Sequence, residues 1–191
     1  MRRTRPGGRT AETRAAVFAA AEALLREKDP GAISMVEIAG RAGVAPTSLY
    51  RRWGDVRTLL TEVAVEGLMR DAPLPDTGSL RGDLGAWART IAAGLASPEG
   101  SVFFRVYVGA VPRSGEEAAG RIEALRGRID QIEAVLERAR ARDEAAPHVF
   151  EVTDHLLAPL YMRALFGNPA DAAFADGLVD YLLSGDRRAY R

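Results

Sequence analysis

The chain has 191 residues, 26 basic and 26 acidic side chains and no cysteine, which excludes disulfide cross-links and every cysteine-based metal or nucleophile site. Its apolar residues are scattered at helical spacing, and no run approaches the roughly 18 uninterrupted positions that a membrane span needs. The basic stretch at residues 1–10 has no apolar run behind it, as a secretory signal would, so we expect a cytoplasmic protein with no membrane partner.

The first seventy residues predict four helices, each bounded by capping or breaking residues. Apolar side chains recur at i, i+4 and i+7 from Val17, which indicates a helix with one buried face. Capping side chains, glycine and proline mark the helix ends. The predicted spans are Thr10 to the stop at 28–31, Ser34 to Ala42, Pro46 to Gly54, and Asp55 to about Arg70.

Three residues in this region have the spacing of a helix-turn-helix. Ala39, Gly43 and Leu49 supply a small residue, a turn residue and an apolar residue at intervals of four and six positions. This arrangement lets two helices cross closely around a turn of three to four residues. The same spacing also occurs in ordinary helical packing, so the pattern alone does not establish DNA binding.

The helix from Pro46 to Gly54 has two chemically different faces. Counting about 100° per residue from Leu49, which we expect to be buried, Trp53 lies near it on the inner side. The outward positions are Thr47 and Arg51, with Ser48 and Tyr50 on the two flanks. Hydroxyl and guanidinium groups on such a face can donate to phosphates and base edges in a major groove, while Trp53 anchors the helix from behind.

The charge is distributed unevenly along the chain. Residues 1–60 carry 11 Lys or Arg against 6 Asp or Glu, a net of +5, whereas residues 61–191 carry 15 against 20, a net of −5. A basic end is typical of a protein that binds a polyanion, although a solvated surface explains charge alone equally well. Together with the helix-turn-helix spacing and the outward donors, it favours double-stranded DNA as a partner.

The rest of the chain also reads as helical. A polar, proline-containing connector at 72–79 marks the predicted domain boundary after Asp71. The predicted helices beyond it are residues 79–95, a helix capped by Ser97 with Pro98 first and interrupted near 111–115, then 116–142, 147–166 and 170–184. The prediction is therefore an all-α protein of about nine helices, with a basic arm (1–9), a helix-turn-helix domain (10–71) and a second helical domain (72–191).

These residues resemble a known family. The stretch MVEIAGRAGVAPTSLYRRWGDVRTLL (35–60), preceded by TAETRAAVFAAAEALL (10–25), is similar to the DNA-binding domain of the tetracycline-repressor (TetR) family of bacterial transcription regulators. The matching positions are Ala39, Gly43, Val44, Leu49, Tyr50 and Trp53. LPDTGSLRGDL (74–84), LASPEG (95–100) and DAAFADGLVDYLL (171–183) resemble the ligand-binding half of one TetR subgroup, so the resemblance covers nearly the whole chain.

The resemblance implies which residues contact DNA. The base-reading positions of the family fall on Val36, Pro46, Thr47 and Tyr50, and its phosphate-contact positions on Ser48, Tyr50 and the free N–H groups at the start of the fourth helix. Val36 cannot hydrogen-bond a base and could touch only a thymine methyl, and Val56 stands where some members have a lysine. The expected compensating residues are Arg51, Arg52 and Arg57, and the arm residues Arg2, Arg3, Arg5 and Arg9 either follow the DNA or form an unimportant tail.

The resemblance also implies an effector-binding and dimerisation domain after residue 72, with the last two helices pairing with their copies in a homodimer. The predicted interface residues are Leu156, Leu160, Tyr161, Ala164, Phe174, Leu178, Tyr181 and Leu182, although any one of them could be ordinary core. Aromatic and polar side chains that could line an effector pocket are Trp87, Phe103, Phe104, Tyr107, His148, His155, Tyr161 and Met162, and each alone could equally be core.

The remaining motifs favour no other chemistry. His148, Glu151 and His155 share one helical face and could meet a metal, but seven residues separate the histidines by about 10 Å, so we expect no metal or other cofactor. P-loop, nucleophile-elbow and dinucleotide motifs are missing, which argues against an enzyme. We therefore expect a ligand-responsive regulator, with repression favoured over activation, that binds a palindromic operator as a homodimer. The alternative is a helical ligand-binding or interaction protein that has lost DNA affinity.

Overall fold

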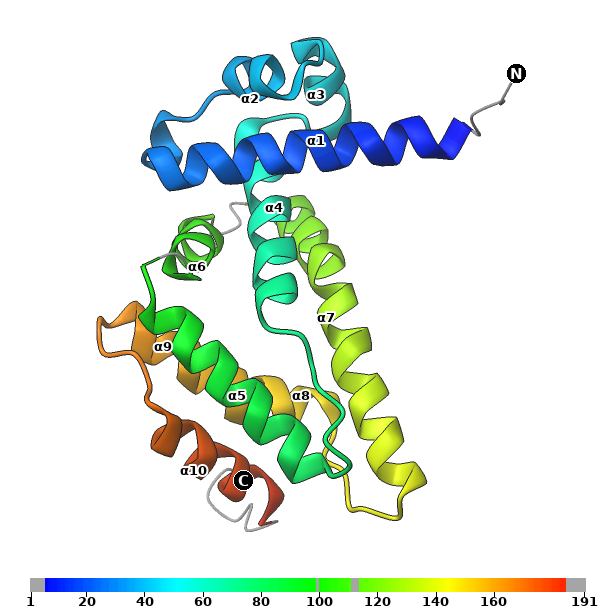
Figure 1. Ribbon diagram of the computed structural model, residues 1–191, viewed down its shortest axis with the longest axis vertical. Coiled ribbons are helices and arrows are strands. Elements are labelled where there is room, and N and C mark those ends of the chain that lie inside the picture. Colours follow the sequence, from blue (N-terminus) through cyan, green and yellow to red (C-terminus); the bar gives the residue numbers. More distant parts are fainter. Residues whose placement is uncertain (1–5, 99, 111–113, 185–191) are drawn as a thin grey trace. The chain divides into compact units, whose positions relative to one another are not determined.

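The computed structural model describes residues 6–98, 100–110 and 114–184, and every regular element in these ranges is a helix, which confirms the all-α prediction (Figure 1). The chain divides into two compact units. The first unit comprises Met1–Gly67 and Val102–Val111, and the second comprises Leu68–Ser101 and Pro112–Arg191. Within the described ranges, none of the helices combines the length and apolar character needed to cross a membrane.

The first unit is built on the helices that the sequence predicts. They are α1 (Pro6–Glu27), the short 3₁₀ turn η1 (Pro30–Ala32), α2 (Met35–Ala42), α3 (Pro46–Trp53) and α4 (Val56–Asp71), with α6 (Gly100–Gly109) contributing from Val102 onward. The predicted apolar faces are buried. Their most deeply buried side chains are Val17, Ala21, Leu24, Ile38, Ala39, Leu49, Leu59 and Val63.

Local hydrogen bonds fix the ends of these helices as predicted. The hydroxyl of Ser34 accepts from the N–H of Glu37 at the start of α2, and Asp55 accepts from the N–H of Thr58 at the start of α4. Gly43, with φ of 68°, adopts the left-handed conformation that ends α2 and begins the turn. This turn lets α3 follow α2 after three residues and gives the helix-turn-helix its crossing.

The first helix begins four residues earlier than predicted. Helix α1 starts at Pro6 and not at a Thr10 cap, because proline suits a first helical turn, where its missing N–H has no partner to lose. The backbone of Arg9 therefore belongs to α1, whereas Arg2, Arg3 and Arg5 lie outside the described residues. The predicted role of these arginines stays a prediction.

The predicted start of the sixth helix is wrong. Ser97 ends α5 (Leu80–Ala96), where its N–H and its hydroxyl both donate to backbone carbonyls of the last turn. Helix α6 then begins at Gly100. A serine beside a helix end can satisfy either the N–H groups that follow it or the carbonyls that precede it, and here the preceding carbonyls take both of its donors.

The second unit contains α5, the long helix α7 (Gly115–Ala141), and a continuous helical run from Val149 to Leu165. The run consists of α8 (Val149–Val152), a π-helical segment η2 (Thr153–Leu157) and α9 (Ala158–Leu165). A uniform helix over this stretch was expected. Pro159 at the start of α9 has no N–H to donate to the preceding turn, and a widened turn directly before it accommodates this loss.

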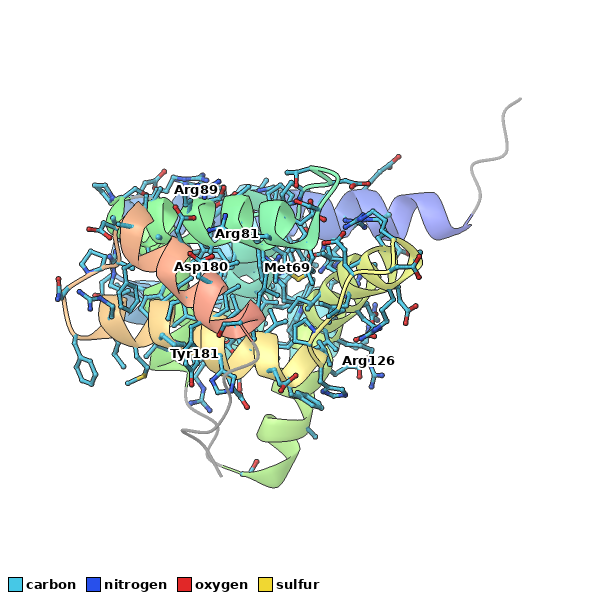
Figure 2. The ribbon with its side chains drawn as sticks, turned by 90° about the horizontal axis from the view of Figure 1, so that it is seen from below. Met69, Arg81, Arg89, Arg126, Asp180 and Tyr181 are labelled. Carbon is cyan, nitrogen blue, oxygen red and sulfur yellow. The ribbon has the colours of Figure 1, made fainter. Side chains whose placement is uncertain are left out.

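Helix α10 (Ala172–Leu183) lies along α5, and both figures show the two helices side by side (Figures 1 and 2). Arg81 of α5 pairs with Asp180 of α10 at 2.6 Å, and Arg89 pairs with Asp176 farther along. These pairs are exposed, so each contributes little stability. The buried apolar side chains hold the unit together, among them Leu84, Trp87, Ile132, Leu136, Leu156, Leu160 and Val179.

Candidate nucleic-acid interface

Helix α3 shows the two faces that its sequence predicts. Leu49 and Trp53 are buried, with Trp53 only 7% exposed, whereas Tyr50 is 49% exposed. Thr47, Arg51 and Arg52 are also exposed, and Pro46 and Ser48 are half-buried. Pro46 stands in the first turn, where its fixed φ favours the helix start. The helix therefore presents hydroxyl and guanidinium donors to solvent while its other face packs into the unit.

A partly buried polar contact anchors α3 from behind. The indole N–H of Trp53 donates to Oε2 of Glu62 on α4 at 2.6 Å, and the Phe18 ring of α1 lies 6.3 Å from the Trp53 ring. A buried tryptophan usually has a partner for its N–H, so the sequence indicates that an acceptor is near but not which one. Glu62 is the functional residue that the sequence analysis missed.

Glu62 also connects α3 to α1 through Arg14. One guanidinium nitrogen of Arg14 lies 2.8 Å from Oε1 of Glu62, and another lies 2.7 Å from Oε2 of Glu66. The Arg14 guanidinium also stacks on Phe18, 3.9 Å from the ring centre. Partial burial disfavours the charged form, but the hydrogen bonds to the two glutamates outweigh it and raise the pKa of Arg14. These contacts hold α1, α3 and α4 in one arrangement.

Other basic residues of the first unit are neutralised by acidic neighbours. Arg41 of α2 forms a two-pronged pair with Glu27 of α1 at 2.6 and 2.9 Å, and Lys28 pairs with Glu37. The hydrogen bonds from Arg41 hold the pKa of Glu27 below its usual value. Because Arg41 and Lys28 already have carboxylate partners, they are not free cations for a polyanion.

Arg51 and Arg52 differ from them. Within the described parts of the chain neither guanidinium pairs with a carboxylate, and Arg52 lies 5.0 Å from the Trp53 ring. A surface arginine without an acidic partner is available to bind an incoming anion. Helix α3 thus carries accessible positive charge of the kind that the basic composition of residues 1–60 indicated.

The remaining predicted DNA contacts surround this helix. Val36, the second residue of α2, is 60% exposed, and Arg57 is half-buried in the first turn of α4. The N–H groups at the start of α4 were expected to be free for a phosphate. The N–H of Thr58 is not free, because the Asp55 carboxylate accepts it at 2.8 Å. This capping interaction places a negative charge where the prediction placed a phosphate.

The predicted effector-pocket residues are divided between the two units. Phe103 and Phe104 are buried and Tyr107 is half-buried, all on α6 in the first unit, where the Phe103 ring packs on Gly67 and leaves no room for a Cβ. The other members belong to the second unit. Of these Trp87 is buried, His155 and Tyr161 are half-buried, and His148 and Met162 are exposed. Their shared role in one pocket stays a prediction.

Two members of the possible metal set cap a helix. Nδ1 of His148 accepts from the N–H of Phe150, and Glu151 accepts from the N–H of His148 at 2.7 Å, so the two side chains form a capping box at α8. His155 instead stacks edge-on against Tyr181 of α10. No group of three or more His, Cys, Asp or Glu side chains is placed to hold a metal ion in the portion of the chain that the structure describes.

The predicted dimer residues face in two directions. Leu156, Leu160 and Leu182 lie in the core of their own unit, because helical periodicity marks a buried face without saying what buries it. Tyr181 is 39% exposed, and the half-exposed members are Tyr161, Ala164, Phe174 and Leu178. Further exposed apolar side chains on the same helices and their flanks are Phe150, Met162, Leu165 and Phe166.

A helix-turn-helix that is anchored from behind and exposes on its second helix arginines with no carboxylate partner among the described residues defines a DNA-binding protein. The matches to known families agree. Residues 17–63 match the model of bacterial regulatory proteins of the tetR family, and residues 74–182 match the tetracyclin repressor-like C-terminal domain. The chain belongs to the TetR family and is a helix-turn-helix transcription regulator.

Relatives along the whole chain support this assignment. The protein is 32% identical to the HTH-type transcriptional regulator AqdR of Rhodococcus erythropolis, over 93% of this chain and 86% of AqdR. It is 29% identical to the uncharacterized HTH-type transcriptional regulator YdeS of Bacillus subtilis, over 87% and 86% of the two chains. The crystal structure of the TetR family transcription regulator SCO0332 is similar with a TM-score of 0.79 and 27% identity, over 91% of this chain and 98% of that one.

A fourth similarity concerns a structure with a bound ligand. The transcriptional regulator FadR of Bacillus subtilis, solved in complex with stearoyl-CoA, has a TM-score of 0.59 and 14% identity to this chain. The alignment covers 89% of this chain and 97% of that one. At this identity the similarity establishes a common fold.

Proposed function

We propose that this regulator is a homodimeric, ligand-responsive repressor that acts in the cytoplasm on a palindromic operator. The observation that carries the proposal is the exposed face of α3, where Arg51 and Arg52 have no carboxylate partner among the described residues. A repressor of this architecture blocks transcription by occupying DNA, which requires only the binding surface and no catalytic group. This is the function that the site supports best.

Residues on this face have distinct proposed roles. Thr47, Tyr50 and Arg51 project from α3 and donate to base edges and phosphates of a major groove. Flanking contacts to the backbone come from Ser48, Arg52 and Arg57, and apolar contacts from Val36 and Pro46. Because the contacts to phosphate carry much of the affinity, binding should weaken steeply with salt.

Dimerisation is proposed through the exposed side of the last two helices. Tyr181, Leu178 and Phe174 place apolar surface on α10, and Tyr161 and Ala164 continue it on α9. A second copy of the chain would bury this surface across a two-fold axis. The two copies of α3 must then lie about 34 to 36 Å apart to enter successive major grooves of the palindrome.

Release from DNA is proposed to follow from an effector in the helical C-terminal domain. The FadR structure with stearoyl-CoA supports a small organic ligand as the signal, although the identity of the effector differs among proteins of one fold. The effector would bind more tightly to a conformation in which the distance between the two copies of α3 does not match the operator. It then lowers operator affinity by the difference between its binding free energies for the two conformations. Helix α4 links the helix-turn-helix to the rest of the chain and is the proposed route of transmission.

The proposal predicts saturable binding to DNA upstream of the protein's own gene. The measurement is a fluorescence titration of a labelled upstream fragment at two salt concentrations, with a scrambled fragment as competitor. We expect binding that survives the competitor, with a stoichiometry of one dimer or paired dimers per site. Specific affinity should exceed non-specific affinity by about 10³-fold or more. Equal binding to the scrambled fragment, repeated with DNA selected from a random library, would instead support a ligand-binding protein without DNA function.

Val36 predicts a particular base contact. A valine at the edge of a helix-turn-helix can recognise only an apolar base feature, and the thymine methyl is the apolar feature of the major groove. Replacing one thymidine of the operator half-site by deoxyuridine removes only this methyl and should weaken binding by about fourfold, the effect of one buried methyl group. The Val36→Ala variant should be insensitive to that same replacement. If wild type tolerates deoxyuridine at every thymine, Val36 does not read the sequence.

A further inference from the structure

The strongest unexplained feature outside the recognition helix is a buried arginine on α7. Arg128 is only 7% exposed. Its two terminal nitrogens donate to the carbonyls of Ala72 at 3.0 Å and Leu68 at 2.9 Å, and one of them also reaches the amide oxygen of Gln131. Leu68 lies in the last turn of α4, and Ala72 follows directly after that helix. The guanidinium therefore spans the C-terminal end of α4.

Among the residues that the structure describes, Arg128 has no carboxylate partner. In the described portion of the chain its partners are two backbone carbonyls, one amide oxygen and the Trp87 ring, 5.3 Å from the guanidinium. Burial lowers the pKa of Arg128, as expected for a cation removed from water. The negative end of the α4 dipole stabilises a cation at this place. Removing a charge from water costs free energy, so a buried arginine contributes little net stability. This indicates that the position of the Arg128 guanidinium at the end of α4 has a role beyond stability.

Trp87 and Gly127 also contact the C-terminal end of α4. The indole N–H of Trp87 donates to the same Ala72 carbonyl at 3.0 Å, so two side chains from α5 and α7 converge on one oxygen. Gly127, next to Arg128, faces Met69 of α4, and a Cβ on Gly127 would lie 3.0 Å from the Met69 methyl. The missing side chain lets the last turn of α4 approach α7 closely. The cluster of Trp87, Gly127 and Arg128 therefore fixes the position of residues 68–72.

Helix α4 is continuous across the two compact units. Its residues up to Gly67 belong to the unit that carries the helix-turn-helix, and Leu68 to Asp71 belong to the second unit. Side chains hold this helix at two places, because Glu62 accepts from Trp53 of α3 and Arg128 donates to the last turn. A helix resists bending over so few turns, so α4 behaves as one stiff element and a constraint on its last turn acts on the element as a whole.

We propose that Arg128 is a positioning residue for operator binding, which fixes the last turn of α4 and thereby the half-site spacing that the dimer accepts. This inference rests on the proposed function, a homodimer on a palindrome. Without the contacts of Arg128, the two recognition helices of the dimer adopt several separations. The dimer then discriminates less between operators that differ in half-site spacing. The intrinsic affinity of one recognition helix for one half-site is unchanged, because Arg128 touches none of the predicted DNA contacts.

The test compares Arg128→Met and Arg128→Lys with Arg126→Met. Arg126 is an exposed arginine on the same helix that pairs with Glu123, so it controls for loss of a positive charge (Figure 2). Affinities are measured for the selected operator, for the same operator with one base pair added or removed at its centre, and for a single half-site. Inserting one base pair turns one half-site by about 34° and moves it by about 3.4 Å, which a rigid dimer tolerates poorly.

Wild type and Arg126→Met should lose about tenfold or more in affinity when the spacing changes, whereas Arg128→Met should lose about threefold or less. Arg128→Lys should lie between them, because an ammonium group is a point charge that cannot span two carbonyls as a guanidinium does. Single half-site binding should be equal in all variants. Hydrogen exchange of the peptide covering residues 64–73 should be faster in Arg128→Met than in wild type and Arg126→Met, which reports the freed helix end directly.

A wild-type spacing preference that Arg128→Met and Arg128→Lys both retain would overturn the inference while leaving the proposed function intact. Absence of specific operator binding, or of any spacing preference, in wild type would contradict the proposed homodimer itself and with it the basis of the inference. Circular dichroism establishes that each variant is folded. If Arg128→Met unfolds, Arg128→Lys decides alone, and a spacing preference equal to that of wild type overturns the inference.

Discussion

Replacing Arg51 by alanine should weaken operator binding by about ten- to a hundredfold while leaving the melting temperature unchanged. Arg51 is exposed on α3 and has no carboxylate partner among the described residues, so its removal costs the folded protein no ion pair. In the complex it supplies a charged donor to a base edge or a phosphate. Tyr50→Ala removes a second, half-exposed donor from the same helix and should act in the same direction.

The measurement is the operator titration at several salt concentrations, together with thermal unfolding. If Arg51 contacts a phosphate, the dependence of log affinity on log salt should become shallower by about one charge, equally for all sequences. If it reads a base, the salt dependence should change little and discrimination at one operator position should relax. Arg126→Ala removes an exposed arginine from α7 and serves as the control. Wild-type affinity in both Arg51→Ala and Tyr50→Ala would mean that another face binds DNA.

Trp53→Ala should destabilise the helix-turn-helix unit by about 3 to 5 kcal/mol, the usual cost of truncating a buried aromatic side chain. The Trp53 side chain is buried, packs beside Phe18, and donates to Glu62. Its loss leaves a cavity behind α3 and removes the link through Glu62 to Arg14. The expected decrease in melting temperature is about 10 °C or more, with operator binding lost in parallel because α3 is no longer held.

Two milder variants separate packing from hydrogen bonding. Trp53→Phe keeps an aromatic ring but loses the N–H donor, and it should destabilise by less than Trp53→Ala. Glu62→Gln keeps an acceptor for Trp53 but loses the charge that pairs with Arg14, so it should weaken the link between α1 and α4. Thermal unfolding followed by circular dichroism measures all three. A melting temperature of Trp53→Ala equal to that of wild type would contradict the anchoring role assigned to this residue.

The order of helices could be predicted because their ends depend on local chemistry. Ser34, Gly43 and Asp55 act on backbone groups within a few residues of themselves, and the structure shows Gly43 and Asp55 in their predicted roles. The same locality explains why the predicted start of the sixth helix was wrong. The hydroxyl and N–H of Ser97 could serve the helix on either side, and the choice depends on where the chain goes next.

The candidate site divides in the same way. The faces of α3 follow from a period of 3.6 residues, so exposure of Arg51 and burial of Trp53 could be predicted from their distance to Leu49. The partners of these side chains could not. Glu62 of α4 accepts a hydrogen bond from Trp53 of α3, a contact between two helices. Arg41 pairs with Glu27 and is not available to DNA, although a net charge counted from the sequence includes Arg41 like any other arginine.

Short-range rules therefore account for the features that could be predicted: the helices, their caps, the helix-turn-helix crossing and the polarity of the exposed face of α3. Three other features depend on how the helices pack: the pairing of Lys28 and Arg41 with carboxylates, the burial of Leu156 and Leu160 within their own unit, and the contact of Arg128 with the end of α4. Such contacts can join residues 60 positions apart, as Arg128 and Leu68 are. Periodicity identifies a buried face, but the identity of what covers it depends on how the helices pack against one another.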